Sequence, residues 1–215
     1  MITVKKFIFN NIEENTYVLY DESKECIIID PGCYTDNEKK KLKDFITETN
    51  LKPTALLNTH CHFDHILGNA FVCHEYNIKL WAHKGEIFNI ERAESYTSMF
   101  GMKIENPPMP SHYLEDGDEF KFGVSTLKII HTPGHSPGCV CLYSETDKLI
   151  ITGDTLFKDS IGRTDLPGGD YNQIMDSLLN KLINLPGETI VYCGHGSSTD
   201  IGRERMYNPF ITEKM

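Results

Sequence analysis

The chain has 215 residues, of which 40% are hydrophobic and 24% are charged, and its formal net charge is −10. This length suits one large domain with a sizeable core or two small domains, and favours neither by itself. The composition is that of an ordinary soluble globular protein. The acidic balance argues against a broad surface for nucleic acid or anionic membranes, because such a surface needs clustered Lys and Arg. No apolar run approaches the length of a membrane span.

Seven cysteines are scattered along the chain, and none of them forms a CxxC pair. The first residues, MITVKKFIFNNIEEN, lack the apolar region and small-residue cleavage site of a secretory signal. Together these features predict a cytoplasmic protein whose thiols are reduced and mostly buried.

The N-terminal half alternates predicted strands and helices. Strands are expected at 2–9, 16–21 and 26–30, followed by a helix at 36–49 with apolar residues at helical spacing. A short strand at 54–59 ends on the sequence THCHFDH. A helix at 66–76, a strand at 79–83 and a helix at 84–99 complete this half.

A loop marked by three prolines separates a second block of predicted strands, at 125–132, 139–144 and 148–154. A helix at 170–183 follows, with Asp170 and Gln173 resembling a capping box and an apolar stripe from Met175 to Leu182. A strand at 189–195 and a short helix end the chain. This order predicts a single α/β domain over 1–215, in which two sheets pack together with helices outside.

Four potential metal ligands crowd into THCHFDH: His60, His62, Asp64 and His65. A transition from strand to loop to helix suits this set, because residues two apart leave an extended segment on the same side. His60 would then face one point with His62, and Asp64 another with His65. Each residue alone has a structural explanation, such as Asp64 capping the next helix. All four together match zinc-type coordination.

Three further potential ligands each follow a predicted strand: His135 in HTPGHSPG, Asp154 in LIITGD and His195 in YCGHG. A carboxylate that leaves a buried apolar strand needs a partner. Rigid strands can bring such loops to one rim although the residues are far apart in sequence. The sequence therefore offers five histidines and two aspartates, which is enough for two metal ions.

The motifs THCHFDH, GHSPG, TGD and CGHG, in this order, resemble the metallo-β-lactamase-fold hydrolases, and GRTDLPGGD resembles their glyoxalase II-like branch. The resemblance implies an αββα sandwich with two mixed sheets flanked by helices. It implies that His60, His62 and His135 hold one metal, that Asp64, His65 and His195 hold a second, and that Asp154 bridges them. The β-lactamase members typically place a cysteine at the second site. An all His/Asp set is similar to the thioesterases and lactonases instead.

Two metals that share a carboxylate can share a water and lower its pKa toward ~7. The bridging hydroxide would attack an ester-type carbonyl, with Asp64 as a catalytic residue that orients it. No serine or cysteine nucleophile is needed, and structural roles are expected for Cys61 and Cys193. The expected cofactors are two divalent ions, zinc first, with iron or manganese as alternatives.

Arg163 and Asp165 in IGRTDLPGGD have two equally weighted interpretations. Either they position the substrate or support the metal shell, or they form a buried ion pair or a set of residues that stabilises a turn.

The leading hypothesis is a glyoxalase II-like thioesterase that cleaves S-acyl-glutathione or a related small-molecule thioester. Glyoxalase II enzymes proper carry a C-terminal helical extension that helps to bind glutathione, whereas only 20 residues follow His195 here. The main alternative is a mononuclear iron persulfide dioxygenase that uses His60, His135 and Asp154. A lactonase is a further alternative, while a non-catalytic metal protein and a nuclease are disfavoured. The sequence does not indicate an oligomeric state.

Overall fold

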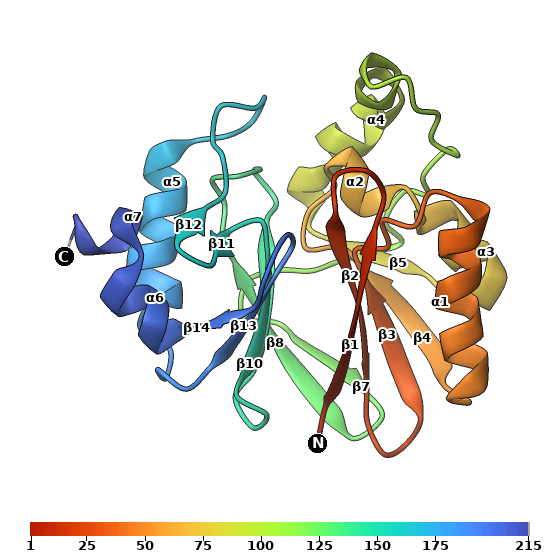
Figure 1. Ribbon diagram of the computed structural model, residues 1–215, viewed down its shortest axis with the longest axis horizontal. Coiled ribbons are helices and arrows are strands. Elements are labelled where there is room, and N and C mark those ends of the chain that lie inside the picture. Colours follow the sequence, from red (N-terminus) through yellow and green to blue (C-terminus); the bar gives the residue numbers. More distant parts are fainter. Residues whose placement is uncertain (215) are drawn as a thin grey trace. The chain divides into compact units, whose positions relative to one another are not determined.

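The computed structural model describes residues 1–214 as two compact units. The first unit comprises Met1–Tyr113 and Lys121–Ser125, and the second comprises Leu114–Phe120 and the chain from Thr126 onward. Each unit has its own sheet, helices and apolar core (Figure 1). The two units are therefore described separately.

The sheet of the first unit has six strands in the order β1-β2-β3-β4-β5-β6. The first three strands form an antiparallel meander, and β3 to β6 are parallel neighbours. Because β3 and β4 run in parallel, the residues that follow them emerge at the same edge of the sheet. The strands are β1 (Thr3–Phe9), β2 (Glu14–Tyr20), β3 (Glu25–Ile29), β4 (Lys52–Leu57), β5 (Leu80–Ala82) and β6 (His112–Tyr113).

Helix α1 (Asp36–Glu48) connects β3 to β4, and a full capping box between Thr35 and Glu38 fixes its start. Its buried residues Leu42 and Ile46 join one core cluster with Val72 of α3 (Asn69–Tyr76) and the apolar face of β2 to β5. In Figure 1, α1 and α3 lie against this sheet. The short helix η1 (Lys84–Glu86) and helix α4 (Ile87–Met99) follow β5.

The predicted helix at 66–76 is interrupted in the structure. It becomes α2 (Phe63–Ile66) and α3 (Asn69–Tyr76), which are separated at Leu67 and Gly68. Gly68 donates its amide to Pro31 O at 2.7 Å, and a Cβ there would lie 2.5 Å from Cys33 Sγ. This close approach of two backbone segments ends the short helix that carries Asp64 and His65.

The second sheet has the order β14-β13-β10-β9-β8-β7. β8, β9 and β10 form an antiparallel meander, whereas β10 and β13 are parallel. The ends of β8, β10 and β13 therefore emerge at one edge. The strands are β7 (Glu119–Phe122), β8 (Ser125–His131), β9 (Val140–Ser144), β10 (Leu149–Gly153), β13 (Ile190–Cys193) and β14 (Thr199–Asp200), with a separate hairpin of β11 (Leu156–Phe157) and β12 (Ser160–Ile161).

The predicted helix at 170–183 begins as expected, with Asp170 accepting the amide of Gln173 at 3.0 Å. After α5 (Tyr171–Asp176), however, the chain continues as a π-helical segment, η2 (Ser177–Leu182). Ile174, Leu178 and Leu182 pack in the core of this unit with Ile201 of α6 (Ile201–Tyr207) and Ile211 of α7 (Pro209–Thr212). An apolar stripe is compatible with both helix types, so its spacing did not reveal the change.

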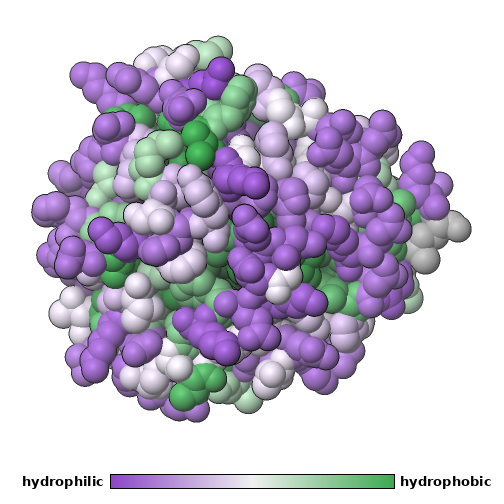
Figure 2. All heavy atoms as spheres, turned by 180° about the vertical axis from the view of Figure 1, so that it is seen from behind, coloured by the Kyte–Doolittle hydropathy of each residue, from purple (hydrophilic) through white to green (hydrophobic). Residues whose placement is uncertain are grey.

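Two mixed sheets with helices packed on them confirm the predicted fold class. The face drawn in Figure 2 is mainly hydrophilic, with hydrophobic residues in small separate patches. Among residues 1–214, none of the helices has the length and apolar character required to cross a membrane.

Candidate metal centre

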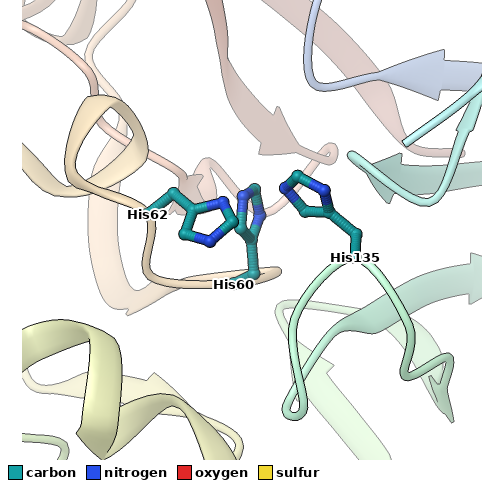
Figure 3. Close-up of side chains that lie close together, drawn as sticks. All are labelled: His60, His62 and His135. Carbon is teal, nitrogen blue, oxygen red and sulfur yellow. The ribbon is translucent and has the colours of Figure 1, made fainter. Parts of the chain in front are cut away.

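The loop after β4 carries the first group of predicted ligands. Asn58 donates its amide to Trp81 O at 2.9 Å, and the chain then leaves the sheet through an irregular segment to His62, the residue before α2. The imidazole of His60 lies 4.8 Å from that of His62 and 4.1 Å from that of His65, measured between ring centroids. Figure 3 shows His60 and His62 projecting from this loop. The predicted transition from strand to loop to helix is confirmed.

Asp30, at the end of β3, braces this loop. Its Oδ1 accepts the Thr59 amide at 2.7 Å and the Asn58 amide group at 3.2 Å. Its Oδ2 lies 3.2 Å from His65 Nδ1. A carboxylate oxygen accepts, so Nδ1 donates and the lone pair of His65 is on Nε2. The brace thus fixes the tautomer of a predicted ligand.

Asp30 is not among the predicted site residues, although the sequence pattern that indicates Asp154 also occurs at Asp30. It ends the apolar run CIIID directly before Pro31 and Gly32, as Asp154 ends LIITGD. Asp30 is 1% exposed, so the expectation that such a carboxylate needs partners applies to it equally.

Two more buried carboxylates support the same loop. Glu86 Oε2 accepts the amide of Cys61, between His60 and His62, at 2.7 Å and the side chain of Asn89 at 2.8 Å. Glu14 lies 3.9 Å from His65 Nδ1, and burial raises the pKa of Glu14 well above its usual value although His65 acts in the opposite direction. Neither residue stands out in the sequence, since both lie in polar stretches.

The second unit brings together the other three predicted ligands. His135 lies in the turn after β8 (Figure 3), Asp154 directly follows β10, and His195 lies two residues after β13. Asp154 Oδ2 is 3.5 Å from His135 Nε2 and 3.6 Å from His195 Nε2. The parallel pairing of β10 and β13 explains this approach, and the amide of Gly194 donates to Gly153 O at 2.7 Å to hold the two strand ends.

The segment after β12 fixes the orientation of His135. His135 Nδ1 lies 2.8 Å from the carbonyl oxygen of Arg163, so Nδ1 donates and Nε2 faces Asp154. Gly162 makes this approach possible, because a Cβ there would lie 1.8 Å from Asp154 O and 3.1 Å from His135 Cβ. The backbone of the GRTD motif therefore supports a predicted ligand.

The side chains of Arg163 and Asp165 form an ion pair with two contacts of 2.7 Å. Both side chains are more than half exposed, so the pair is not the buried one considered from the sequence. The hydrogen bond from Arg163 lowers the pKa of Asp165 to about 2. Their predicted contact with a substrate stays a prediction.

The donor groups fit a metal site in both units. Two ligands of one ion about 2.1 Å away lie roughly 3.4 Å apart at the tetrahedral angle. The distances from Asp154 Oδ2 to His135 Nε2 and to His195 Nε2 are close to this value. The distance of 3.5 Å between Asp64 Oδ2 and His65 Nε2 is close to it as well. Asp30, His60 and His65 also cluster within 4.8 Å, but hydrogen bonds engage both oxygens of Asp30.

The buried cysteines are poor candidates for a reactive nucleophile. The seven cysteines form no disulfide within residues 1–214. Burial raises the pKa of Cys26, Cys33, Cys141 and Cys193 to about 12, which keeps these thiols protonated at neutral pH. Cys61 is fully buried, as expected for a structural role.

Residues 12–195 match the model of the metallo-beta-lactamase superfamily, and the chain belongs to this family. It is 39% identical over 201 residues to the probable metallo-hydrolase YqgX of Bacillus subtilis, covering 93% of each chain. It is 33% identical over 204 residues to the hydroxyacylglutathione hydrolase GloC of Haemophilus influenzae, covering 94% of each. The protein is accordingly a metallo-hydrolase of this superfamily.

Two crystal structures are similar to nearly the whole chain. The BLEG-1 B3 metallo-beta-lactamase is 38% identical, with a TM-score of 0.90 and coverage of 98% of this chain and all of that one. TTHA1623 in a di-iron-bound form is 36% identical, with a TM-score of 0.86 and coverage of 96% and 100%. These structures support the predicted fold, and the second shows iron bound by a similar protein.

Proposed function

We propose that the protein is a binuclear metal-dependent hydrolase that cleaves S-acyl-glutathione or a related small-molecule thioester. The observation that carries this proposal is the carboxylate of Asp154, which has His135 Nε2 at 3.5 Å and His195 Nε2 at 3.6 Å. One carboxylate oxygen with an imidazole nitrogen on each of two loops is the arrangement expected of a bridging ligand.

The proposed ligand sets follow the family resemblance. His60, His62 and His135 would hold the first ion, Asp64, His65 and His195 would hold the second, and Asp154 would be the ligand that both ions share. Two divalent ions, when bound, supply a hydroxide near neutral pH and polarise the substrate carbonyl. Zinc is the first candidate, and the iron in the similar TTHA1623 keeps iron as an alternative.

The side chains of this chain orient the reactants in the proposed reaction. Asp64 is 7% exposed, and its carboxylate would orient the attacking hydroxide as well as bind metal. His135 and His65 present Nε2 because their Nδ1 atoms donate to Arg163 O and Asp30. Hydroxide adds to the thioester carbonyl and the C–S bond breaks, which yields a carboxylate and a thiol. The protonated buried cysteines take no part.

The substrate class is supported by the GloC relative, which is described as a hydroxyacylglutathione hydrolase. In the proposal, the exposed guanidinium of Arg163 contacts the substrate, while its backbone carbonyl orients His135. The net charge of −10 favours a small-molecule substrate over nucleic acid, and the absence of disulfides within residues 1–214 supports a cytoplasmic location.

Metal analysis combined with a thioester assay tests the proposal. Protein purified without chelators is expected to contain two ions per chain and to cleave S-lactoylglutathione, and Asp154→Asn is expected to lose both the second ion and activity. Lys148→Met, which removes an exposed ion pair with Glu188, is the control. Reconstituted protein with two ions but no cleavage of any thioester would contradict the proposed substrate class.

A mononuclear iron persulfide dioxygenase is the second candidate, because THCHFDH and GRTD also resemble the motifs of those enzymes. The di-iron form of the similar TTHA1623 supports iron as a metal, but not a mononuclear site. It would use His60, His135 and Asp154, and would consume oxygen with glutathione persulfide. One iron per chain together with oxygen uptake, and without thioester cleavage, would favour this candidate. A lactone and a β-lactam belong in the same substrate panel, the latter because of the similarity to BLEG-1.

A further inference from the structure

The turn that carries His135 receives three hydrogen bonds from one helical segment. The amide of Asp170 donates to Gly134 O at 2.8 Å, at the start of α5. Ser177 Oγ donates to Pro133 O at 2.9 Å, and Lys181 Nζ donates to His131 O at 2.6 Å. Three carbonyls among the four residues before His135 are thus held by α5 and η2.

The helical segment also lies directly on the turn backbone. Gly134 has a φ of +136°, and a Cβ at this position would lie 2.2 Å from Ile174 N and 2.4 Å from Ile174 Cα. No side chain separates the two backbones, so a shift of the segment shifts the turn. The buried residues Ile174 and Leu178 anchor the segment in the core of its unit.

Ser177 and Lys181 both belong to the π-helical segment and are four residues apart, which places them near one face of it. The bond from Ile183 N to Leu178 O, at 3.0 Å, spans five residues as a π-helix requires. Such segments are uncommon and frequently occur at functional sites.

Lys181 makes a closer contact with a backbone carbonyl than with a carboxylate. Its ammonium is 2.6 Å from the neutral carbonyl of His131 but 3.7 Å from Asp116 Oδ2. Its side chain is 31% exposed, so its stem is largely packed. The amide of His131 donates to Asp116 Oδ1 at 2.7 Å, so both backbone groups of this residue are engaged.

We infer that Ser177 and Lys181 are positioning residues for the metal centre, which act by holding the carbonyls before His135 so that its imidazole faces Asp154. This inference rests on the proposed role of His135 as a metal ligand. Arg163 O fixes the ring of His135, and the helical segment fixes the backbone from which that ring projects. Metal affinity therefore depends on two side chains that do not touch the metal.

Zinc affinity, measured by competition with a chromogenic chelator, tests this inference in the full chain. Ser177→Ala and Lys181→Met are each expected to weaken Zn²⁺ binding about tenfold, as is typical when partners that orient a ligand are removed. Ser177→Thr and Lys181→Arg keep the donors and are expected to restore binding to within about threefold. Asn180→Ala is the matched control, because Asn180 lies in the same segment but bonds to Asp176 instead of the turn.

Urea unfolding of the metal-free variants separates positioning from stability. Unchanged Zn²⁺ affinity in Ser177→Ala and Lys181→Met would overturn the inference, whatever their unfolding midpoints. If Ser177→Ala does not fold, the comparison of Lys181→Met with Lys181→Arg decides. His135→Ala tests the proposed function separately: unchanged zinc stoichiometry and affinity in that variant would remove His135 from the ligand set.

Discussion

Asp30 and Asp154 each end an apolar strand, yet their carboxylates have different surroundings. The carboxylate of Asp30 makes four contacts, with Thr59, Asn58 and His65, and all of them fix the loop that carries His60 and His62. Asp154 instead faces two imidazole nitrogens. At the scale of the residue, Asp30 therefore holds a loop in place through hydrogen bonds, whereas Asp154 is a candidate metal ligand.

Replacing Asp30 with Asn tests this brace. Asparagine keeps one carbonyl oxygen as an acceptor but replaces the other oxygen with an NH₂ group. Depending on the orientation of the side chain, this NH₂ group faces the donor of Thr59 or the donor His65 Nδ1. We expect the free energy of unfolding to fall by about 1–3 kcal/mol because buried donors lose their acceptor. We expect Zn²⁺ affinity to fall about 10- to 100-fold. Urea unfolding and metal titration measure the two effects.

Asp44→Asn is the control for that experiment, because Asp44 lies on the surface of α1 in an exposed ion pair with Lys40. It is expected to change neither quantity appreciably. A D30N protein with normal metal affinity would show that Asp30 serves only stability.

Gly162→Ala tests the close approach between the GRTD segment and the candidate ligands. The added methyl group would lie 1.8 Å from Asp154 O, so either Gly162 or Asp154 must move. We expect a loss of about 1–3 kcal/mol in the free energy of unfolding and a weaker metal affinity. Gly187→Ala is the matched control, because its Cβ would meet only ordinary contacts, the nearest at 3.5 Å. Equal effects of the two substitutions would contradict a specific role for Gly162.

At the scale of the element, Asp21 joins the turn between β2 and β3 to the segment between β7 and β8. Its carboxylate accepts from Ser23, from the amide of Val124 at 2.8 Å and from Ser125 Oγ at 2.8 Å. Burial by itself raises the pKa of Asp21, but these hydrogen bonds outweigh it and lower the pKa from 3.8 to about 2. The ionised form is therefore the one that stabilises the junction.

This shift predicts a specific acid sensitivity. Because the pKa of Asp21 is lower in the folded protein than in the unfolded chain, its stabilising contribution is present above pH 4. The contribution, about 2 kcal/mol, is lost as the pH falls toward 2. Urea unfolding between pH 6 and pH 2 should show a smaller decrease for Asp21→Asn than for the native protein. Parallel pH profiles for the two proteins would contradict this assignment.

The elements show what sequence patterns could and could not predict. Strands that end in ligand-type residues were predictable, because an apolar run that stops at Asp or His leaves a clear signal, as at Asp154. The break at Gly68 was not, because it depends on the approach of Pro31 and Cys33 from another part of the chain. The burial of Glu14 and Glu86 likewise arises from tertiary contacts, which their polar sequence surroundings do not indicate.

At the scale of the whole molecule, the chain divides into two compact units. The prediction of a single domain stays a prediction. The chain passes between the units three times, and β7 is divided between them at Phe120 and Lys121. Because β7 continues from one unit into the other, unfolding of one unit alone would have to stop within this strand. We expect a single cooperative unfolding transition.

The buried thiols can report on this transition in each unit. Cys26 and Cys33 lie in the core of the first unit, and Cys141 and Cys193 lie in the core of the second. With a pKa of about 12, each thiol is almost entirely protonated at pH 8, whereas an unfolded cysteine with a pKa near ~8.5 reacts readily. Brief iodoacetamide labelling along a urea gradient, read by peptide mass spectrometry, gives a midpoint for each cysteine.

A single domain predicts the same midpoint for the cysteine pairs of both units. Cys73 is only partly buried, although burial raises the pKa of its thiol too. It is expected to label faster than the fully buried cysteines before the transition and provides an internal control for reagent access. Midpoints for the two pairs that differ by more than their measurement error would show that the units unfold independently. In that case, the two groups of candidate ligands would belong to separately stable parts of the chain.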